Sequence, residues 1–171
     1  MPAGPAQAQS LKQEPELADK FIPLAPQFMV APQLTADDIR AAAANGVTLI
    51  VNNRPDGEII GQPKSAELEA AAKDAGVAYV HLPVDVRGIT PDHTAGLEQA
   101  MNDAPEGKTL AFCRSGTRST LVWSYAEARF GKPVAQIIEE AAAAGYDISG
   151  HEPALTLLFE AHKAPRTEPP L

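Results

Sequence analysis

Along this chain, short runs of apolar residues alternate with longer amphipathic stretches. Apolar runs that predict strands lie at 47–51, 77–82 and 109–112, with one or two short edge strands within 21–30, where Pro23 and Pro26 interrupt the run. Helices are predicted from about 35, 65 and 90 and, after the last strand, at about 119–130, 134–144 and 153–162. This alternation indicates an α/β fold with three layers, in which helices flank a mainly parallel central sheet.

The periodic pattern is confined to the middle of the chain. Residues 1–19 are rich in Ala, Pro, Gln and Glu and have little to bury, and residues 164–171 contain three prolines. We therefore expect one domain at 20–163, between a flexible N-terminal tail and a loose C-terminal tail. A single domain of this size can bury a substantial apolar core.

Composition and charge exclude several classes of partner. The 171 residues carry a formal net charge of −8, which argues against nucleic acid and anionic membranes as partners. No apolar run approaches the ~20 residues of a membrane-spanning helix. Residues 1–10 also lack the basic and apolar regions that a secretory signal contains. A single cysteine cannot form an intrachain disulfide. These features predict a cytoplasmic protein.

The one cysteine follows the last predicted strand and opens a short loop. Residues 113–119 read Cys-Arg-Ser-Gly-Thr-Arg-Ser, and an amphipathic stretch begins just after them. Helix N-terminal N–H groups and arginine charges both stabilise a thiolate and bind oxyanions. Cys113 is therefore the candidate nucleophile, and Arg118 is the candidate clamp for an anion. An inert buried thiol is the alternative interpretation.

The other residues of this loop are candidates for anion binding. Ser115, Gly116 and Thr117 would contribute backbone N–H donors, and Gly116 permits a close approach or a positive φ. Arg114 would either face the anion or point outward and pair with an acidic side chain. Ser119 would either N-cap the following helix or donate its hydroxyl to the thiolate.

The spacing within the loop distinguishes two chemistries. Cysteine phosphatases use a Cys-x5-Arg loop, whereas here only four residues separate Cys113 from Arg118. Rhodanese-type sulfurtransferases use a loop about one residue shorter, whose thiolate takes up a sulfur atom as a persulfide, and this loop resembles theirs. Phe112 also stands where many phosphatases of this type have histidine.

Polar residues that follow the other predicted strands would share a rim with the cysteine, since ligands of such sheets bind beyond the carboxyl ends of the strands. Asn53 and Arg54 follow the run at 47–51 and would either contact the substrate or hold a turn. Asp85 follows the run at 77–82 and is the candidate general acid, which phosphate-ester hydrolysis needs and sulfur transfer does not. Asp92 is the weaker candidate for this role, because its position also fits the start of a helix.

The wider sequence resembles a bacterial family. Residues 50–58 (Ile-Val-Asn-Asn-Arg-Pro-Asp-Gly-Glu), 78–84 (Ala-Tyr-Val-His-Leu-Pro-Val) and the loop 113–119 carry a resemblance, over roughly 21–162, to the beta-lactamase-hydrolase-like phosphatase-like domain family, DUF442. The resemblance implies the fold of dual-specificity phosphatases, and the family is labelled both phosphatase and sulfur transferase. Some members are fused to a metallo-beta-lactamase-like persulfide dioxygenase, which makes such an enzyme a candidate partner.

Two activities and one binding role follow. The first expectation is a cysteine-dependent sulfurtransferase on a phosphatase-like fold, in which Cys113 takes sulfane sulfur from thiosulfate or a small persulfide and passes it to an external thiol. The alternative is hydrolysis of a phosphomonoester through a phosphocysteine intermediate. The third is a non-catalytic module that binds an anionic partner. All three roles require the loop at Cys113 to bind a small anion or an anionic group of a partner. We expect no metal or other cofactor.

Overall fold

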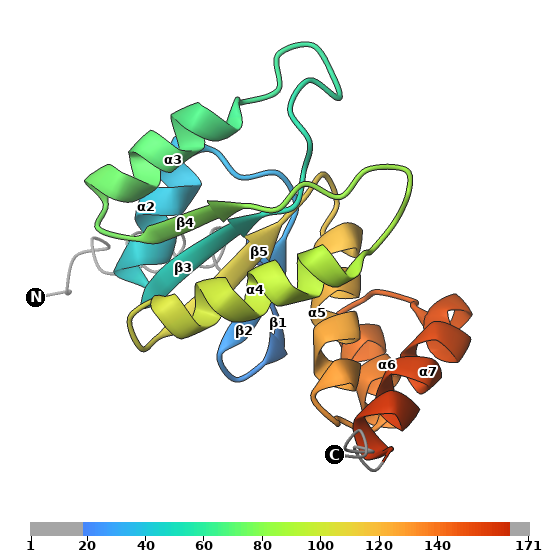
Figure 1. The fold of residues 1–171 in the computed structure, drawn as a ribbon. Helices are drawn as coiled ribbons and strands as arrows, with labels where there is room; N and C mark the ends of the chain where they lie inside the picture. Colours follow the sequence, from blue (N-terminus) through green and yellow to red (C-terminus); the bar gives the residue numbers. More distant parts are fainter. Residues whose placement is uncertain (1–18, 165–171) are drawn as a thin grey trace, which may run out of the picture.

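The structure is a computed structural model that describes residues 19–164, so the predicted tails lie outside it except for one residue each. Five strands form one sheet in the order β1-β2-β5-β3-β4 (Figure 1). They are β1 (Ile22–Ala25), β2 (Phe28–Ala31), β3 (Val47–Asn52), β4 (Ala78–His81) and β5 (Lys108–Phe112). Strands β1 and β2 are antiparallel, and the other three pairs are parallel. The mostly parallel sheet that the sequence predicts is confirmed.

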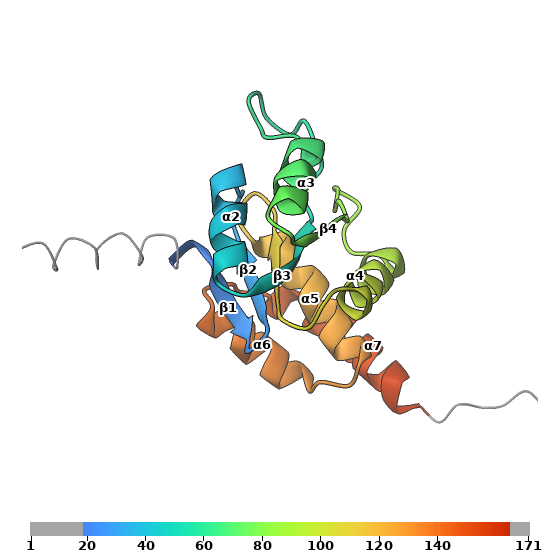
Figure 2. The same cartoon turned by 90° about the vertical axis from the view of Figure 1, so that its left-hand side faces the viewer.

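Helices cover both faces of this sheet, as Figures 1 and 2 show. One face carries α2 (Ala36–Ala44) and α3 (Ser65–Asp74). The other carries α4 (Pro91–Asp103), α5 (Thr117–Arg129), α6 (Val134–Ala143) and α7 (Glu152–Lys163), with a 3-10 turn at Ser149–His151. Among the described residues, no helix combines the length and the apolar character needed to cross a membrane. The three predicted layers are therefore present.

Each face of the sheet has its own apolar core. In β5, Leu110 and Phe112 face the core beneath α2 and α3, which also contains Ile39 and Leu68. Ala111, between them, belongs to the core on the opposite face. Strands that are buried on both faces read as uninterrupted apolar runs, which is why the sequence marks β3 and β5 so clearly.

Two element assignments from the sequence need correction. The run at 21–30 is expected to hold edge strands, but β2 pairs with both β1 and β5, so that of these two strands only β1 lies at an edge of the sheet. Pro23 lies in this outer strand, where a missing N–H is tolerated. Helix α5 begins at Thr117, two residues before the predicted start, because Gly116 is its N-cap. Ser119 is therefore inside the helix, and the prediction that it caps the helix is wrong.

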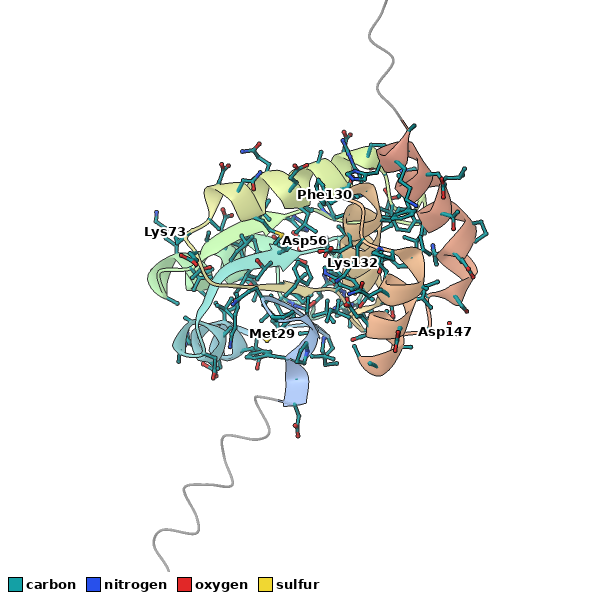
Figure 3. The ribbon with its side chains drawn as sticks, turned by 90° about the horizontal axis from the view of Figure 1, so that it is seen from below. Met29, Asp56, Lys73, Phe130, Lys132 and Asp147 are labelled. Atoms are coloured by element: carbon teal, nitrogen blue, oxygen red, sulfur yellow. The ribbon has the colours of Figure 1, made fainter. Side chains whose placement is uncertain are left out.

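Trp123 fixes α5 against the sheet. This residue is fully buried, and its ring centroid lies 6.3 Å from that of Phe28 in β2. The Lys132 Nζ lies 5.0 Å from the centre of the same ring, and Figure 3 shows Lys132 in the connection that follows α5. Because this face of α5 is anchored, the N-terminus of the helix is held at the carboxyl end of β5, where Cys113 follows.

Candidate functional site

Cys113 lies in the turn between β5 and α5, and only 1% of the residue is exposed. The Gly116 N–H donates to the Cys113 Sγ at 3.0 Å. The turn is tied to the neighbouring segment, since the Cys113 N–H donates to the Ala31 carbonyl at 3.4 Å and the Gln33 N–H donates to the Arg114 carbonyl at 3.3 Å. Backbone N–H groups that converge on one point in a turn form an anion-binding concavity. The sulfur therefore occupies a place suited to negative charge.

Gly116 and Tyr146 together shape this turn. Gly116 has φ +92°, in the left-handed region that favours glycine. A Cβ at this position would lie 2.2 Å from the Tyr146 Oη. The Tyr146 hydroxyl donates to the Ser115 carbonyl at 3.0 Å, and burial, with a smaller contribution from Cys113, raises the pKa of Tyr146 above its ordinary value. The hydroxyl thus remains a donor that closes one side of the turn.

The remaining side chains of the loop face solvent. Arg114, Ser115 and Thr117 are exposed, and the Ser115 Oγ lies 3.1 Å from the Thr117 Oγ1. Within residues 19–164, Arg114 forms no ion pair. Arg114 therefore points outward, as one of the two interpretations expects, but within residues 19–164 it does not pair with an acidic side chain.

Arg118 is held at the start of α5 by Glu58. Its Nη1 and Nη2 donate to the two Glu58 oxygens at 2.8 Å each, and Nη1 also donates to the Val84 carbonyl at 3.0 Å. The Glu58 hydrogen bonds, with a further contribution from Cys113, raise the pKa of Arg118 above its ordinary value. A guanidinium has five N–H donors, so these contacts leave donors for an anion beside the thiol.

Arg54 lies behind the same carboxylate and is only 2% exposed. Its Nε donates to the Glu58 Oε1 at 2.8 Å, and its Nη1 donates to the Gln33 Oε1 at 2.9 Å. The Arg54 N–H donates to the Asn52 Oδ1 at 2.9 Å, which is the Asx turn that the sequence allows here. Its Nη2 is buried and has no hydrogen-bond partner among the described residues.

Asn53 and Ser119 join the end of β3 to the first turn of α5. The Ser119 Oγ donates to the Asn53 Oδ1 at 2.8 Å, and the Asn53 Nδ2 donates to the Leu82 carbonyl at 3.0 Å. Both residues are fully buried. The Ser119 hydroxyl therefore points to Asn53, not to the thiol, and the pair aligns the segments that follow β3, β4 and β5.

Asp85 stands outside this network in the described structure. Its side chain is 44% exposed and pairs with Arg87, whose Nη2 lies 2.7 Å from the Asp85 Oδ2. Hydrogen bonds from Arg87 lower the pKa of Asp85 to about 2, so this carboxyl group is ionised at neutral pH. The preceding residue, Val84, contacts Arg118 through its carbonyl. Asp85 thus lies on a loop that touches the site, without being one of the groups gathered around Cys113.

Glu58, Tyr146 and Gln33 are the site residues that sequence reasoning did not select. Glu58 has a sequence signal, because it ends the motif at 52–58 and lies four residues after Arg54. Tyr146 has no such signal, since nothing in its neighbourhood points to a residue 31 positions earlier.

The contribution of Glu58 to the stability of the fold depends on pH in the acidic range. The hydrogen bonds from Arg118, and then from Arg54, lower the pKa of Glu58 from 4.5 to about 2. Because the folded-state pKa is the lower one, the stabilisation is present above about pH 4.5 and is lost as the pH falls through about 2. We expect Glu58→Gln to cost stability at neutral pH, and this cost to shrink below about pH 4.5. Urea unfolding across that range measures the difference, and a cost that stays constant down to about pH 2 would contradict the assignment.

The donors around Cys113 suit an anion. They are backbone N–H groups and guanidinium groups, and neither type binds a cation. Among residues 19–164, no group of three or more His, Cys, Asp or Glu side chains is arranged to hold a metal ion. The arrangement can therefore bind a small oxyanion next to a thiol.

Comparisons with known proteins agree with this geometry. Residues 20–130 match the family model described as "Beta-lactamase hydrolase-like protein, phosphatase-like domain". The beta-lactamase hydrolase-like protein of Agrobacterium fabrum is 33% identical over 121 residues, which are 71% of this chain and 28% of that protein. This chain thus spans little more than a quarter of the curated relative that it matches.

Solved structures show the same fold. A proposed phosphatase from Neisseria meningitidis is 35% identical, with a TM-score of 0.70 over 80% of this chain and 96% of that one. A proposed dual-specificity phosphatase from mouse is 22% identical, with a TM-score of 0.59 over 87% of this chain and 94% of that one. The fold is thus that of dual-specificity phosphatases. Since the family model covers most of the chain, including the turn at Cys113, the protein belongs to the family of the phosphatase-like domain of beta-lactamase hydrolase-like proteins.

Proposed function

We propose that this domain is a cysteine-dependent phosphatase that hydrolyses a small phosphomonoester through a phosphocysteine at Cys113. The observation that carries the proposal is the buried Cys113 Sγ, which accepts the Gly116 N–H at 3.0 Å beside the charged Arg118. The Neisseria relative, at 35% identity, is a proposed phosphatase. The mouse structure is a complex with zinc tungstate, and tungstate is a tetrahedral oxyanion like phosphate. The description of the first and the oxyanion in the second both support phosphate chemistry on this fold.

The proposed reaction has two displacements. The Cys113 thiolate attacks phosphorus, the S–P bond forms, and the P–O bond to the leaving group breaks; water then cleaves the S–P bond and releases phosphate. Backbone N–H groups of 115–117 and the free donors of Arg118 stabilise the non-bridging oxygens. The leaving oxygen needs a proton, for which Asp85 is the candidate. Because Asp85 is paired with Arg87, it has to leave this partner and take up a proton first.

The role of Asp85 is tested by leaving groups of different basicity. We expect Asp85→Asn to lower kcat for an alkyl phosphate by about 10²- to 10³-fold, because a basic alkoxide leaves slowly without a general acid. Turnover of p-nitrophenyl phosphate should fall far less, since its leaving group needs little protonation. Asp74→Asn, an exposed acid at the end of α3, is the matched control. Equal alkyl phosphate turnover by Asp85→Asn and wild type would remove Asp85 from the mechanism.

Sulfur transfer through a Cys113 persulfide is the second candidate. Two observations favour it: only four residues separate Cys113 from Arg118, and Asp85 is ionised and paired with Arg87. In this reaction the thiolate takes the outer sulfur of thiosulfate and releases sulfite, with no need for an acid. Since the chain has one cysteine, the persulfide must pass to an external thiol. A cytoplasmic location would supply such thiols, and a persulfide dioxygenase would be a suitable partner.

Parallel assays distinguish the two candidates. The proposed phosphatase should release inorganic phosphate from p-nitrophenyl phosphate and show a phosphoryl adduct on Cys113 after acid quenching. A sulfurtransferase should instead form thiocyanate from thiosulfate and cyanide and carry one extra sulfur atom on Cys113. Binding of phosphate without turnover of either substrate would reject both and leave an anion-binding module.

A further inference from the structure

Glu58 is shared between two arginines, and one of these arginines is incompletely satisfied. The Glu58 Oε1 accepts from both Arg118 Nη2 and Arg54 Nε at 2.8 Å, and its Oε2 accepts from Arg118 Nη1 at 2.8 Å. The Arg54 Nη2 is buried without a partner among the described residues. A buried charged donor without an acceptor costs stability, so a second arrangement of this carboxylate would relieve that cost.

The second arrangement requires one hydrogen bond to move. Nε and one Nη of a guanidinium share an edge whose spacing matches the two oxygens of a carboxylate. If Glu58 keeps its Oε1 bond to the Arg54 Nε, rotation of the carboxylate carries Oε2 from the Arg118 Nη1 to the Arg54 Nη2. The Glu58 side chain is 30% exposed, so neighbouring groups do not enclose it on all sides.

An anion beside Cys113 would favour that second arrangement. The oxyanion would bind the free donors of Arg118, whose other donors hold Glu58 and the Val84 carbonyl. Two negative groups would then share one guanidinium and repel each other at short range. Movement of one Glu58 oxygen to Arg54 lessens this repulsion and satisfies the buried Nη2.

We propose that Glu58 is a positioning residue that holds Arg118 in the resting site. When an oxyanion binds beside Cys113, one oxygen of the Glu58 carboxylate turns from Arg118 to Arg54 and accepts a hydrogen bond there, a change that is called the exchange below. The inference rests on the proposed function only for the presence of that oxyanion. Arg54 thereby offers a second pair of donors to Glu58, which explains why a buried arginine keeps one Nη group without a partner among the described residues. The charge of Arg118 becomes available to the ligand without the loss of an ion pair for Glu58.

Inorganic phosphate is the probe, and its Kd is measured for wild type, Glu58→Gln, Arg54→Lys and the double variant. Glu58→Gln removes the repulsion and should tighten binding about fivefold, the size of one exposed charge interaction. Arg54→Lys keeps the charge but offers no paired edge, so binding should weaken about fivefold. The double variant should match Glu58→Gln, because Arg54 acts through Glu58. Glu69→Gln, an exposed acid on α3, should leave the Kd unchanged.

A second measurement leaves the buried Arg54 intact. The crystal structure of the wild type with inorganic phosphate at Cys113 should place the Glu58 Oε2 about 2.9 Å from the Arg54 Nη2. A phosphate complex in which Glu58 keeps both bonds to Arg118 would overturn the inference, as would weaker phosphate binding by Glu58→Gln.

The outcomes also separate this inference from the proposed phosphatase activity. Retained Glu58–Arg118 contacts in the phosphate complex, together with normal turnover, would reject the exchange and leave the activity standing. Tighter phosphate binding by Glu58→Gln without turnover of any phosphomonoester would support the exchange and count against the activity. Failure of both wild type and Glu58→Gln to bind phosphate would overturn the exchange.

Discussion

Replacement of Cys113 by serine is expected to reduce phosphomonoester turnover by at least about 10³-fold. The serine hydroxyl is not ionised near neutral pH, so it cannot replace the thiolate in the attack on phosphorus. The fold should survive, because serine is slightly smaller and its oxygen can accept the Gly116 N–H that Sγ accepts at 3.0 Å. Steady-state kinetics with p-nitrophenyl phosphate and thermal unfolding of the same samples measure the two effects.

Phosphate binding is the control for this variant. Cys113→Ser should still bind inorganic phosphate, because the backbone donors and Arg118 are unchanged. Turnover that stays within about tenfold of the wild type would show that the thiol is not the nucleophile. If the variant lost both phosphate binding and turnover, the structure of the turn would have changed. The loss of turnover could then not be assigned to the missing thiolate.

Alanine at Gly116 is expected to damage both stability and anion binding. A side chain at φ +92° is strained by about 1–3 kcal/mol. The added Cβ would also meet the Tyr146 Oη at 2.2 Å, so the turn or the tyrosine has to move. Either movement shifts the N–H that faces Cys113. Urea unfolding and phosphate titration should therefore both report a loss.

Two further variants separate strain from the clash at Gly116. The double variant Gly116→Ala, Tyr146→Ala removes the clash but keeps the strain, so phosphate binding should recover only in part. Gly150→Ala is the matched control, because a Cβ there meets nothing within 4 Å and its φ is not positive. If Gly116→Ala behaved like Gly150→Ala, the turn would not depend on glycine.

The positions of the strands along the chain and the position of the thiol could be predicted because their causes are local. Buried strands such as β3 and β5 are continuous apolar runs, and Cys113 follows β5 directly in sequence. The carboxyl ends of parallel strands share one rim, so Asn53 and Cys113 were expected on the same side. The structure connects the two segments through Ser119, whose hydroxyl donates to Asn53.

The ion-pair network could not be predicted, because it depends on contacts between distant loops. Glu58 and Arg118 are 60 residues apart, and no periodicity shows which loop closes on which. Arg54 was expected at a rim because it follows a predicted strand, yet the residue is buried and its charge is compensated by Glu58 and Gln33. For Ser119, capping preference suggested a helix start that the left-handed backbone of Gly116 places earlier.

Gln33 connects two loops of the site, the loop that carries the thiol and the loop that carries Arg54 and Glu58. Its backbone N–H holds the loop of the thiol at Arg114, and its side chain holds Arg54, which in turn holds Glu58. A displacement of the segment after β2 would therefore move both loops together. We therefore expect substitutions at position 33 to alter the alignment of the thiol and the guanidinium, although every residue around the anion stays the same.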